Sequence, residues 1–300
     1  MHGDDTPAPR TLRTSDGQTL HLQHWPAHPT AGPVQGTVQL VHGLGEHTGR
    51  YEALAQRLNA AGWHVAGHDH RGHGRSSGAR GVLPVQPVLL PDLALALDAV
   101  RNTPGGVGPR YVLLGHSLGG LIAARFVAEG LMHRPRPWYR ELHGLVLSSP
   151  ALDAGLRWHQ KALLAVLRPL MPALALSNGL QADWLSRDPE VVRRYQADPL
   201  VHDRITPRLL HFIVSEGAVL RPLAARWRTP TLLMWSGADR CVQPAGSARF
   251  AAAAPPAVVQ AREFPTFFHE IFNEPEHAEV EALLLAWLQR QAAPPGPPQS

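Results

Sequence analysis

Hydrophobic residues fall into short unbroken runs that alternate with longer segments of helical spacing. The length and β-branched content of the runs predict buried strands over residues 37–41, 63–67, 111–114, 145–149, 231–235 and 258–264. Apolar positions three and four apart predict helices over residues 50–61, 89–101, 120–129, 246–254 and 275–290. Before the first run, Asp16-Gly17 lies between residues 10–14 and 18–25 and predicts a β-hairpin. The alternation as a whole predicts an α/β fold, with a mostly parallel sheet flanked by helices on both faces.

One long segment departs from this alternation. Residues 151–228 lack the buried runs, are rich in Pro, Arg and Trp, and read as helical. We expect them to form a cap over the carboxyl ends of the strands, where open α/β sheets hold their active sites. The α/β core then covers residues 10–150 and 229–292. Residues 1–9 and 293–300 are predicted to be disordered tails.

Composition and charge narrow the class of protein without changing this picture. The 300 residues, 44% of them hydrophobic, suit a soluble globular protein. The net charge is +4, but the basic residues, all arginine except Lys161, are spread along the chain, so we expect no nucleic-acid binding. Cys241 is the single cysteine, which excludes an internal disulfide. The absence of a signal-peptide pattern and of an apolar stretch of about 20 residues favours a cytoplasmic location.

The candidate chemistry begins at Gly115-His116-Ser117-Leu118-Gly119. This stretch fits the G-x-S-x-G pattern of a nucleophile elbow, with a predicted strand before it and a predicted helix after it. Glycines let the strand and the helix approach closely, and the helix N-terminus favours a developing anion. The context predicts Ser117 as a catalytic nucleophile.

A nucleophilic serine needs a base and an acid that orients the base, in the chain order Ser, Asp or Glu, His. Asp239 follows the strand at residues 231–235, and Asp153, which could instead cap a helix, is the rival acid. His269 lies between the last strand and the last helix and is the expected base. The oxyanion hole needs two amides, for which Leu118 and Leu44 are the candidates.

These residues sit in stretches that resemble the monoacylglycerol lipase and lysophospholipase branch of the α/β-hydrolases. The resemblance runs from residue 37 to about 290 and lies in His42-Gly43-Leu44-Gly45-Glu46-His47 with Arg50-Tyr51, Asp69-His70-Arg71-Gly72-His73-Gly74-Arg75-Ser76, Gly115-His116-Ser117-Leu118-Gly119-Gly120, Asp198-Pro199-Leu200, Gly237-Ala238-Asp239 and His269-Glu270. It implies the α/β-hydrolase fold and the same triad of Ser117, Asp239 and His269.

The resemblance also implies a polar pocket for a glycerol head group, at the positions of Glu46, Arg50, His116 and Tyr195. Each has a plainer alternative: Glu46 and Arg50, four residues apart, could form an ordinary ion pair, and His116 could only fill the elbow. Some family members carry a second histidine three residues after the catalytic one. This chain departs from that pattern, because the position is Phe272.

Two other features of the sequence resemble functional sites, a possible metal site and a possible reactive thiol, and we expect neither to be one. His64, His68, His70 and His73 are close in sequence, but their spacing matches no zinc site, and we expect no metal. Cys241, two residues after Asp239, is expected to be an inert loop cysteine, with a reactive thiol as the alternative.

The cap carries apolar residues on more than one stripe: Leu156, Trp158, Leu163, Leu164, Val166, Leu167, Leu170 and Met171. Such a helix could bury one face against the sheet and line an acyl-chain tunnel with the other. Arg157 and Lys161 favour, as an alternative, contact with an anionic membrane or micelle surface.

The sequence thus predicts a serine esterase or lipase that cleaves fatty-acid esters, such as monoacylglycerols or similar single-chain lipids, without a cofactor. A lysophospholipase, a general carboxylesterase and an acyltransferase would use the same triad. A non-catalytic binder of a hydrophobic ligand is the alternative of another class. The small-molecule lipid ester is the expected partner, and the oligomeric state is left open.

Overall fold

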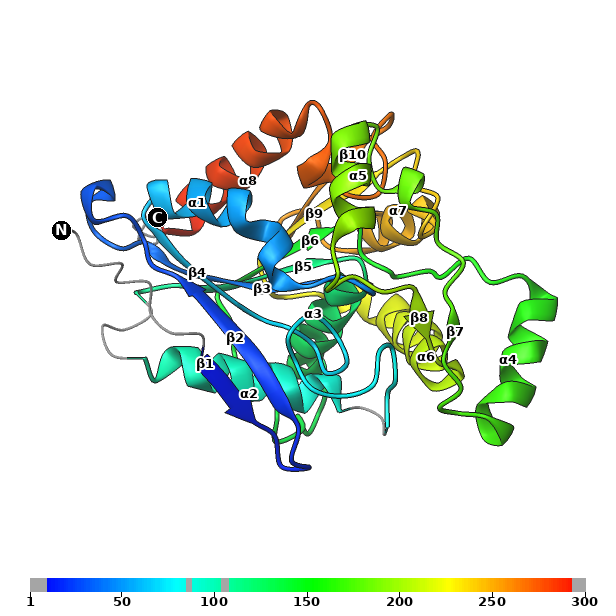
Figure 1. Ribbon diagram of the computed structural model, residues 1–300. Coiled ribbons are helices and arrows are strands. Elements are labelled where there is room, and N and C mark those ends of the chain that lie inside the picture. Colours follow the sequence, from blue (N-terminus) through cyan, green and yellow to red (C-terminus); the bar gives the residue numbers. More distant parts are fainter. Residues whose placement is uncertain (1–9, 85–87, 104–107, 293–300) are drawn as a thin grey trace.

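A sheet in the order β1-β2-β4-β3-β5-β6-β9-β10 runs through the computed structural model, which describes residues 10–84, 88–103 and 108–292 (Figure 1). The β1–β2 hairpin and the β2–β4 pair are antiparallel, and all pairs from β4 to β10 are parallel. The strands are β1 (Arg10–Arg13), β2 (Thr19–Trp25), β3 (Gly36–Val41), β4 (Trp63–His68), β5 (Tyr111–His116), β6 (Gly144–Ser148), β9 (Thr231–Ser236) and β10 (Val259–Phe264). This confirms the predicted mostly parallel sheet and the predicted hairpin.

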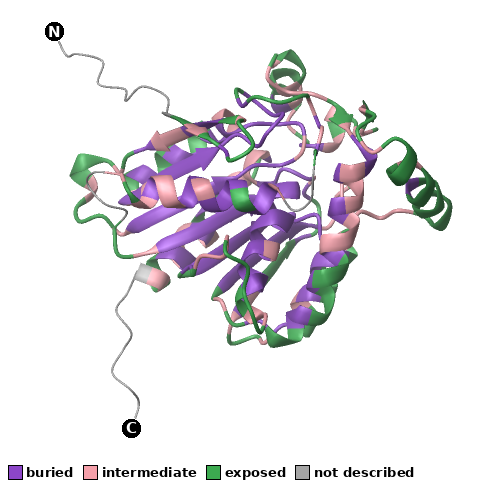
Figure 2. Cartoon of the chain, turned by 90° about the horizontal axis from the view of Figure 1, so that it is seen from below, coloured by how far each residue is buried: buried purple, intermediate pink, exposed green. Residues whose placement is uncertain are grey.

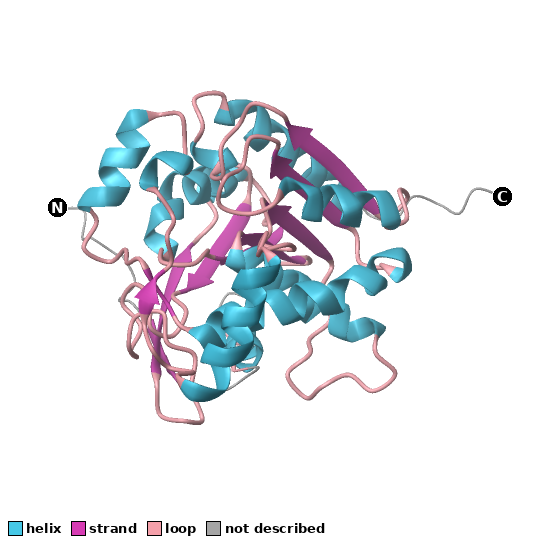
Figure 3. Ribbon diagram, turned by 90° about the vertical axis from the view of Figure 1, so that its right-hand side faces the viewer, coloured by secondary structure: helices cyan, strands magenta, loops and turns pink. Residues whose placement is uncertain are grey.

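Helices cover both faces of the sheet (Figure 3). Side chains of β5 alternate between two apolar clusters, because successive residues of a strand point to opposite faces. Val112 and Leu114 join the cluster of α1 (Glu52–Ala60) and α8 (His277–Ala292). Tyr111 and Leu113 join the cluster of α2 (Leu89–Arg101), α3 (Leu118–Ala128) and α7 (Pro244–Ala253). Strands buried on both faces explain why the runs in the sequence are unbroken (Figure 2).

The segment between β6 and β9 contains α4 (Trp158–Leu170), α5 (Pro189–Ala197) and α6 (Pro207–Leu223). It also contains a two-stranded sheet of β7 (Leu176–Ser177) and β8 (Arg204–Ile205), which the sequence did not predict. Helix α4 projects from the body of the protein and packs on α6, instead of burying a face on the sheet (Figures 1 and 2). Leu164 is its buried side chain. The exact bounds of the cap and core stay a prediction, and the predicted tails lie outside the described residues.

Across the described part of the chain, every helix is too short or too polar to span a bilayer.

Buried histidines gather where β3 and β4 end. The rings of His42 and His70 are 4.1 Å apart between centroids, and those of His73 and His202 are 4.6 Å apart. Burial lowers the pKa of His68 and His202 to about 4 and that of His73 to about 3, and holds the pKa of His42 and His70 well below the ordinary value of 6.5. These side chains are packed as neutral imidazoles, which agrees with a structural role.

This cluster predicts a loss of stability in mild acid. Below pH 6.5 the unfolded chain binds protons on these histidines, whereas in the folded chain His68 gains its proton only near pH 4 and His73 only near pH 3. The free energy of unfolding is therefore expected to fall by roughly 1.4 kcal/mol per pH unit for each such histidine. Urea unfolding between pH 7.5 and 4.5 measures this slope.

His68→Leu should reduce the slope by the contribution of one proton, roughly 1.4 kcal/mol per pH unit. The substitution should be tolerated, because neither ring nitrogen of His68 has a hydrogen-bond partner to lose. His133→Gln, at an exposed position, is the control and should leave the slope unchanged. A wild-type stability that is constant from pH 6.5 to 4.5 would contradict the prediction.

Candidate active site

The candidate nucleophile, Ser117, occupies a sharp turn between β5 and α3. Its backbone has φ 52° and ψ −118°, and such a positive φ costs a non-glycine residue of order 1–3 kcal/mol. The Ser117 N–H donates to the Ser148 carbonyl oxygen at 3.0 Å, which holds the turn. A Cβ on Gly119 would lie 1.9 Å from the Val41 carbonyl oxygen, so only glycine fits there. The strand, turn and helix predicted for a nucleophile elbow are therefore present.

Asp239 and His269 are brought together from the loops after β9 and β10. Asp239 Oδ2 lies 2.7 Å from His269 Nδ1. Asp239 Oδ1 accepts the N–H groups of Cys241 at 2.8 Å and Val242 at 3.0 Å, which fixes the carboxylate. The rival Asp153 instead accepts from the Gly155 N–H and pairs with the exposed Arg249. The geometry therefore favours Asp239 over Asp153 as the acid that orients His269.

The electrostatics of this pair suit a general base. Burial opposes ionisation of Asp239, but the neighbouring His269 and the two amide donors outweigh it and lower the pKa of Asp239. Burial likewise opposes protonation of His269, but the Asp239 carboxylate, with smaller effects of Glu270 and Glu46, raises the pKa of His269 above 6.5. An imidazole held this way accepts a proton readily, with its Nδ1 hydrogen directed to the carboxylate.

His116, the residue before the nucleophile, packs beside the base. The centroids of the His116 and His269 rings are 4.7 Å apart. Burial, together with the neighbouring His269, lowers the pKa of His116 to about 4, so His116 is neutral when His269 gains a proton. Its Nδ1 lies 3.1 Å from the Ser148 carbonyl oxygen, to which it donates. These contacts agree with the alternative in which His116 fills the elbow.

The loop after β3 lies against the elbow, as an oxyanion hole requires. A Cβ on Gly43 would lie 3.2 Å from the Ser117 Cβ, so the backbone of the loop passes close to the nucleophile. Leu44 follows Gly43, and Leu118 begins α3. Both leucines line one cavity with Ser117. The oxyanion role of their amides stays a prediction.

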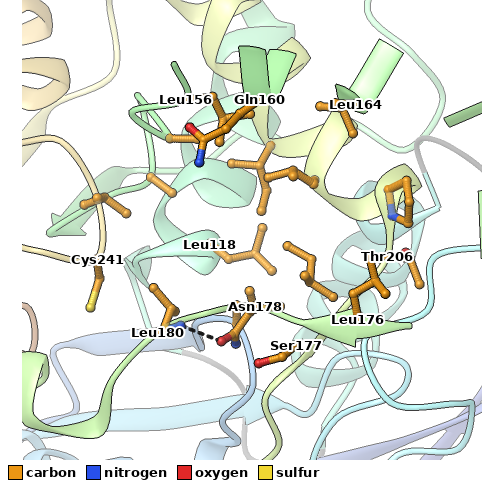
Figure 4. A pocket seen from close by; sticks show the side chains of 18 of the residues that line it. Leu118, Leu156, Gln160, Leu164, Leu176, Ser177, Asn178, Leu180, Thr206 and Cys241 are labelled. Carbon is orange, nitrogen blue, oxygen red and sulfur yellow. Dashed lines mark hydrogen bonds between the residues drawn. The ribbon is translucent and has the colours of Figure 1, made fainter. Parts of the chain in front are cut away.

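That cavity has a volume of about 370 Å³ and is lined mainly by aliphatic side chains of the segment above the sheet (Figure 4). Helix α4 contributes Gln160 and Leu164 to the lining, and Leu156 lies just before this helix. Strand β7 and the residues after it contribute Leu176 and Leu180. One face of α4 thus lines a cavity over Ser117, as predicted.

Glu46, Arg50 and Glu270 form a buried ion cluster next to this cavity. Arg50 Nη1 donates to Glu46 Oε2 at 2.7 Å and to Glu270 Oε1 at 2.5 Å, and Nη2 donates to Glu270 Oε2 at 2.8 Å. Glu46 Oε1 accepts the Gly43 N–H at 2.6 Å and the Tyr51 hydroxyl at 2.7 Å. Burial disfavours the charged forms of Glu270 and Arg50. The ion pairs outweigh burial, because Arg50 lowers the pKa of Glu270 and the two carboxylates raise the pKa of Arg50.

The four positions expected at a head-group pocket lie near one another: Arg50 bonds to Glu46, and a Cβ on Gly43 would lie 2.9 Å from Glu46 Oε1 and 3.3 Å from His116 Cδ2. Arg50 stacks over the Tyr195 ring, with Cζ 4.8 Å from the ring centroid. Both line a second, polar cavity of about 660 Å³. Of the four, none is among the described residues that line the cavity with Ser117. The head-group role stays a prediction, and the ion-pair alternative for Glu46 and Arg50 has direct geometric support.

Ligand atoms of Asp239, Cys241 and His269 lie within 4.8 Å of one another, a spacing that would also suit a metal ion. The Asp239 and His269 atoms already bond to each other at 2.7 Å. Burial raises the pKa of the Cys241 thiol, which disfavours the thiolate that a metal requires. The same shift agrees with an inert cysteine.

Sequence reasoning did not assign a role to Glu270 or Tyr51. Glu270 follows the candidate base, and its charge at that position is the signal that could have marked it as a site residue. Its partner Arg50 lies 220 residues earlier, so nothing local reveals the pair. Tyr51 belongs to the motif around Arg50, but the sequence does not predict its hydrogen bond to Glu46.

Asp239→Asn tests the assignment of the acid. We expect kcat for ester hydrolysis to fall by about 10⁴-fold, because the amide no longer holds the productive imidazole tautomer. The acidic limb of kcat/KM should move to lower pH, because losing the carboxylate lowers the pKa of His269. Asp153→Asn is the matched control and should keep wild-type kcat. An equal loss in both variants would sink the assignment.

Comparison with known proteins places the chain in a family. A family model described as serine aminopeptidase, S33, matches residues 32–276. The monoacylglycerol lipase of Mycolicibacterium smegmatis is 36% identical over 263 residues, 85% of this chain and 88% of that protein. An abhydrolase domain-containing protein of Dictyostelium discoideum is 32% identical over 93% of this chain, which spans 29% of that relative's length.

Among solved structures, the monoacylglycerol lipase of Paleococcus ferrophilus matches with a TM-score of 0.77 and 36% identity, over 91% of this chain and 99% of that one. This likeness confirms the predicted α/β-hydrolase fold. The extent of the family match, joined to the identity with these relatives, leads to one conclusion: the chain belongs to the S33 family of α/β-hydrolases and is a serine hydrolase.

Proposed function

We propose that the protein hydrolyses carboxylic esters of fatty acids, with monoacylglycerols or similar single-chain lipids as substrates. The observation that carries this is Ser117 at an aliphatic cavity of about 370 Å³. A cavity of roughly 150 Å³ holds a benzene-sized guest, so this one has room for a single acyl chain. The monoacylglycerol lipases among its relatives support the same substrate class.

The residues around Ser117 supply each step of acyl transfer. Ser117 Oγ attacks the ester carbonyl while His269 takes its proton, and Asp239 stabilises the imidazolium that forms. The Leu44 and Leu118 amides hold the oxyanion. His269 then gives the proton to the leaving alcohol, activates a water and releases the fatty acid from Ser117.

The cavity favours lipid esters over peptides with a free α-amine. An aminopeptidase needs an acidic group to bind the substrate ammonium, and the described lining of the cavity contains no Asp or Glu. Lysophospholipids, short-chain esters and acyl transfer to an alcohol use the same triad. A substrate panel of varied acyl chain and head group distinguishes them.

Ser117→Ala tests the function. On medium-chain p-nitrophenyl esters and monoacylglycerols we expect kcat to fall by at least about 10³-fold, because the acyl-enzyme cannot form. A fluorophosphonate probe should label the wild type and not the variant. Ser215→Ala, on α6 and away from the cavity lining, is the control and should keep both activities. Wild-type protein that neither hydrolyses any ester nor takes the label would instead support a non-catalytic binder.

We further propose that α4 contacts a membrane or micelle surface while the enzyme works. Trp158 is 81% exposed and Leu170 73%, and Val166 and Met171 are also more than half exposed. Arg157 and Lys161 beside them are exposed cations. An apolar face with flanking cations is typical of helices that lie on anionic lipid.

The double variant Trp158→Ser with Leu170→Ser tests this contact. We expect its partitioning onto phosphatidylglycerol vesicles, measured by sedimentation, to weaken by at least about tenfold, because both side chains lose their burial in lipid. Val34→Ser removes an exposed apolar residue far along the sequence and is the control. Equal sedimentation of the wild type and the double variant would refute the contact.

A further inference from the structure

We propose that Arg50, held between Glu46 and Glu270, is a positioning residue: it sets the loop after β3, which carries Leu44, and the loop that carries His269 relative to each other. The proposal rests on the ester hydrolysis proposed above. The buried ion cluster takes no direct part in the proposed reaction steps, and the proposal gives it a role.

Both ends of the cluster reach the reacting groups through a single peptide unit. At one end, Glu46 Oε1 accepts the Gly43 N–H at 2.6 Å, and the next amide is that of Leu44. At the other end, Glu270 follows His269 and receives two hydrogen bonds from Arg50, at 2.5 and 2.8 Å. Two parallel bonds from a planar guanidinium fix direction as well as distance. A shift of Arg50 would therefore move both loops.

The hydrogen-bonding capacity of the cluster is largely occupied within the protein. Both Glu46 oxygens accept protein donors, from Gly43 and Tyr51 on one side and from Arg50 on the other. Glu270 Oε2 also accepts from Asn273 Nδ2 at 2.8 Å. The carboxylates are 3% and 5% exposed. The two carboxylates are therefore engaged mainly by donors of the protein itself.

The position of the cluster points the same way. Arg50 lines the polar cavity of about 660 Å³, together with Tyr195, whose ring covers one face of the guanidinium. Ser117 lines the other, aliphatic cavity. The Gly43 backbone lies between the cluster and the nucleophile, since a Cβ on Gly43 would be 2.9 Å from Glu46 Oε1 and 3.2 Å from Ser117 Cβ.

The charges of the cluster also act on the base. Two carboxylates and one guanidinium leave a net negative charge near His269, and both carboxylates raise the pKa of His269. Replacing one glutamate by glutamine leaves Arg50 less compensated. The pKa of His269 should then fall, which gives the cluster a signature that a purely structural contact lacks.

The test compares two substrates with the same acyl chain, a monoacylglycerol and a p-nitrophenyl ester, in Glu270→Gln and Glu46→Gln. A misplacement of about 1 Å can cost roughly 10²-fold in rate. We expect kcat to fall about 10- to 100-fold on both substrates, KM to change less than about threefold, and the acidic limb of kcat/KM to move to lower pH. If either variant unfolds, Arg50→Lys replaces it, because lysine keeps the charge and loses the paired bonds.

Glu129→Gln is the matched control. Glu129 is a buried carboxylate that pairs with Arg125 at 2.7 Å and is not among the described residues that line either cavity, so its variant should keep wild-type kcat and pH profile. In an Arg50→Gln background, Glu46→Gln and Glu270→Gln should add little further loss, because their shared partner is gone.

A rise in KM confined to the monoacylglycerol, with the p-nitrophenyl ester unaffected, would show a head-group site and overturn the proposal. An unchanged kcat and pH profile on both substrates would overturn it as well. Failure of the proposed function has a different result, since the wild type itself would then hydrolyse neither ester.

Discussion

The close approach of α3 to the end of β3 is the contact on which the candidate site depends. A Cβ on Gly119 would overlap the Val41 carbonyl oxygen and come within 2.4 Å of that of His42. Because the backbones meet there, the loop after β3 reaches Ser117, and Leu44 and Leu118 line the same cavity. The strained backbone at Ser117 persists because these packed elements determine it from both sides.

The sequence was most informative where parallel-sheet geometry constrains the chain. Strands buried on both faces appear as unbroken apolar runs, and their carboxyl ends meet at one edge of the sheet. The order of Ser117, Asp239 and His269 along those ends was therefore enough to predict that Asp239 and His269 would meet. The hydrogen bond between them agrees with that reasoning.

The segment above the sheet was predicted less well, since its contacts join residues far apart in the chain. Helical spacing showed that α4 has two apolar faces, but it did not show that α6, instead of the sheet, receives one of them. The two-residue strands β7 and β8 are too short to leave a pattern. The pairing of Arg50 with Glu270 depends on side-chain direction in two separate loops, which spacing does not encode.

Helix α4, which forms one wall of the cavity, is anchored less firmly than the rest of the segment above the sheet. Elsewhere in this segment, Glu270 N–H donates to the Leu185 carbonyl oxygen at 2.8 Å and His202 N–H to that of Gly45 at 2.9 Å, which tie it to the sheet. Helix α4 has Leu164 as its buried anchor. Its amides should therefore exchange with solvent deuterium far sooner than those of α3, and the helix can rearrange without disturbing Ser117, Asp239 or His269. The α4 wall of the cavity and the residues that react beneath it are thus expected to differ in local stability.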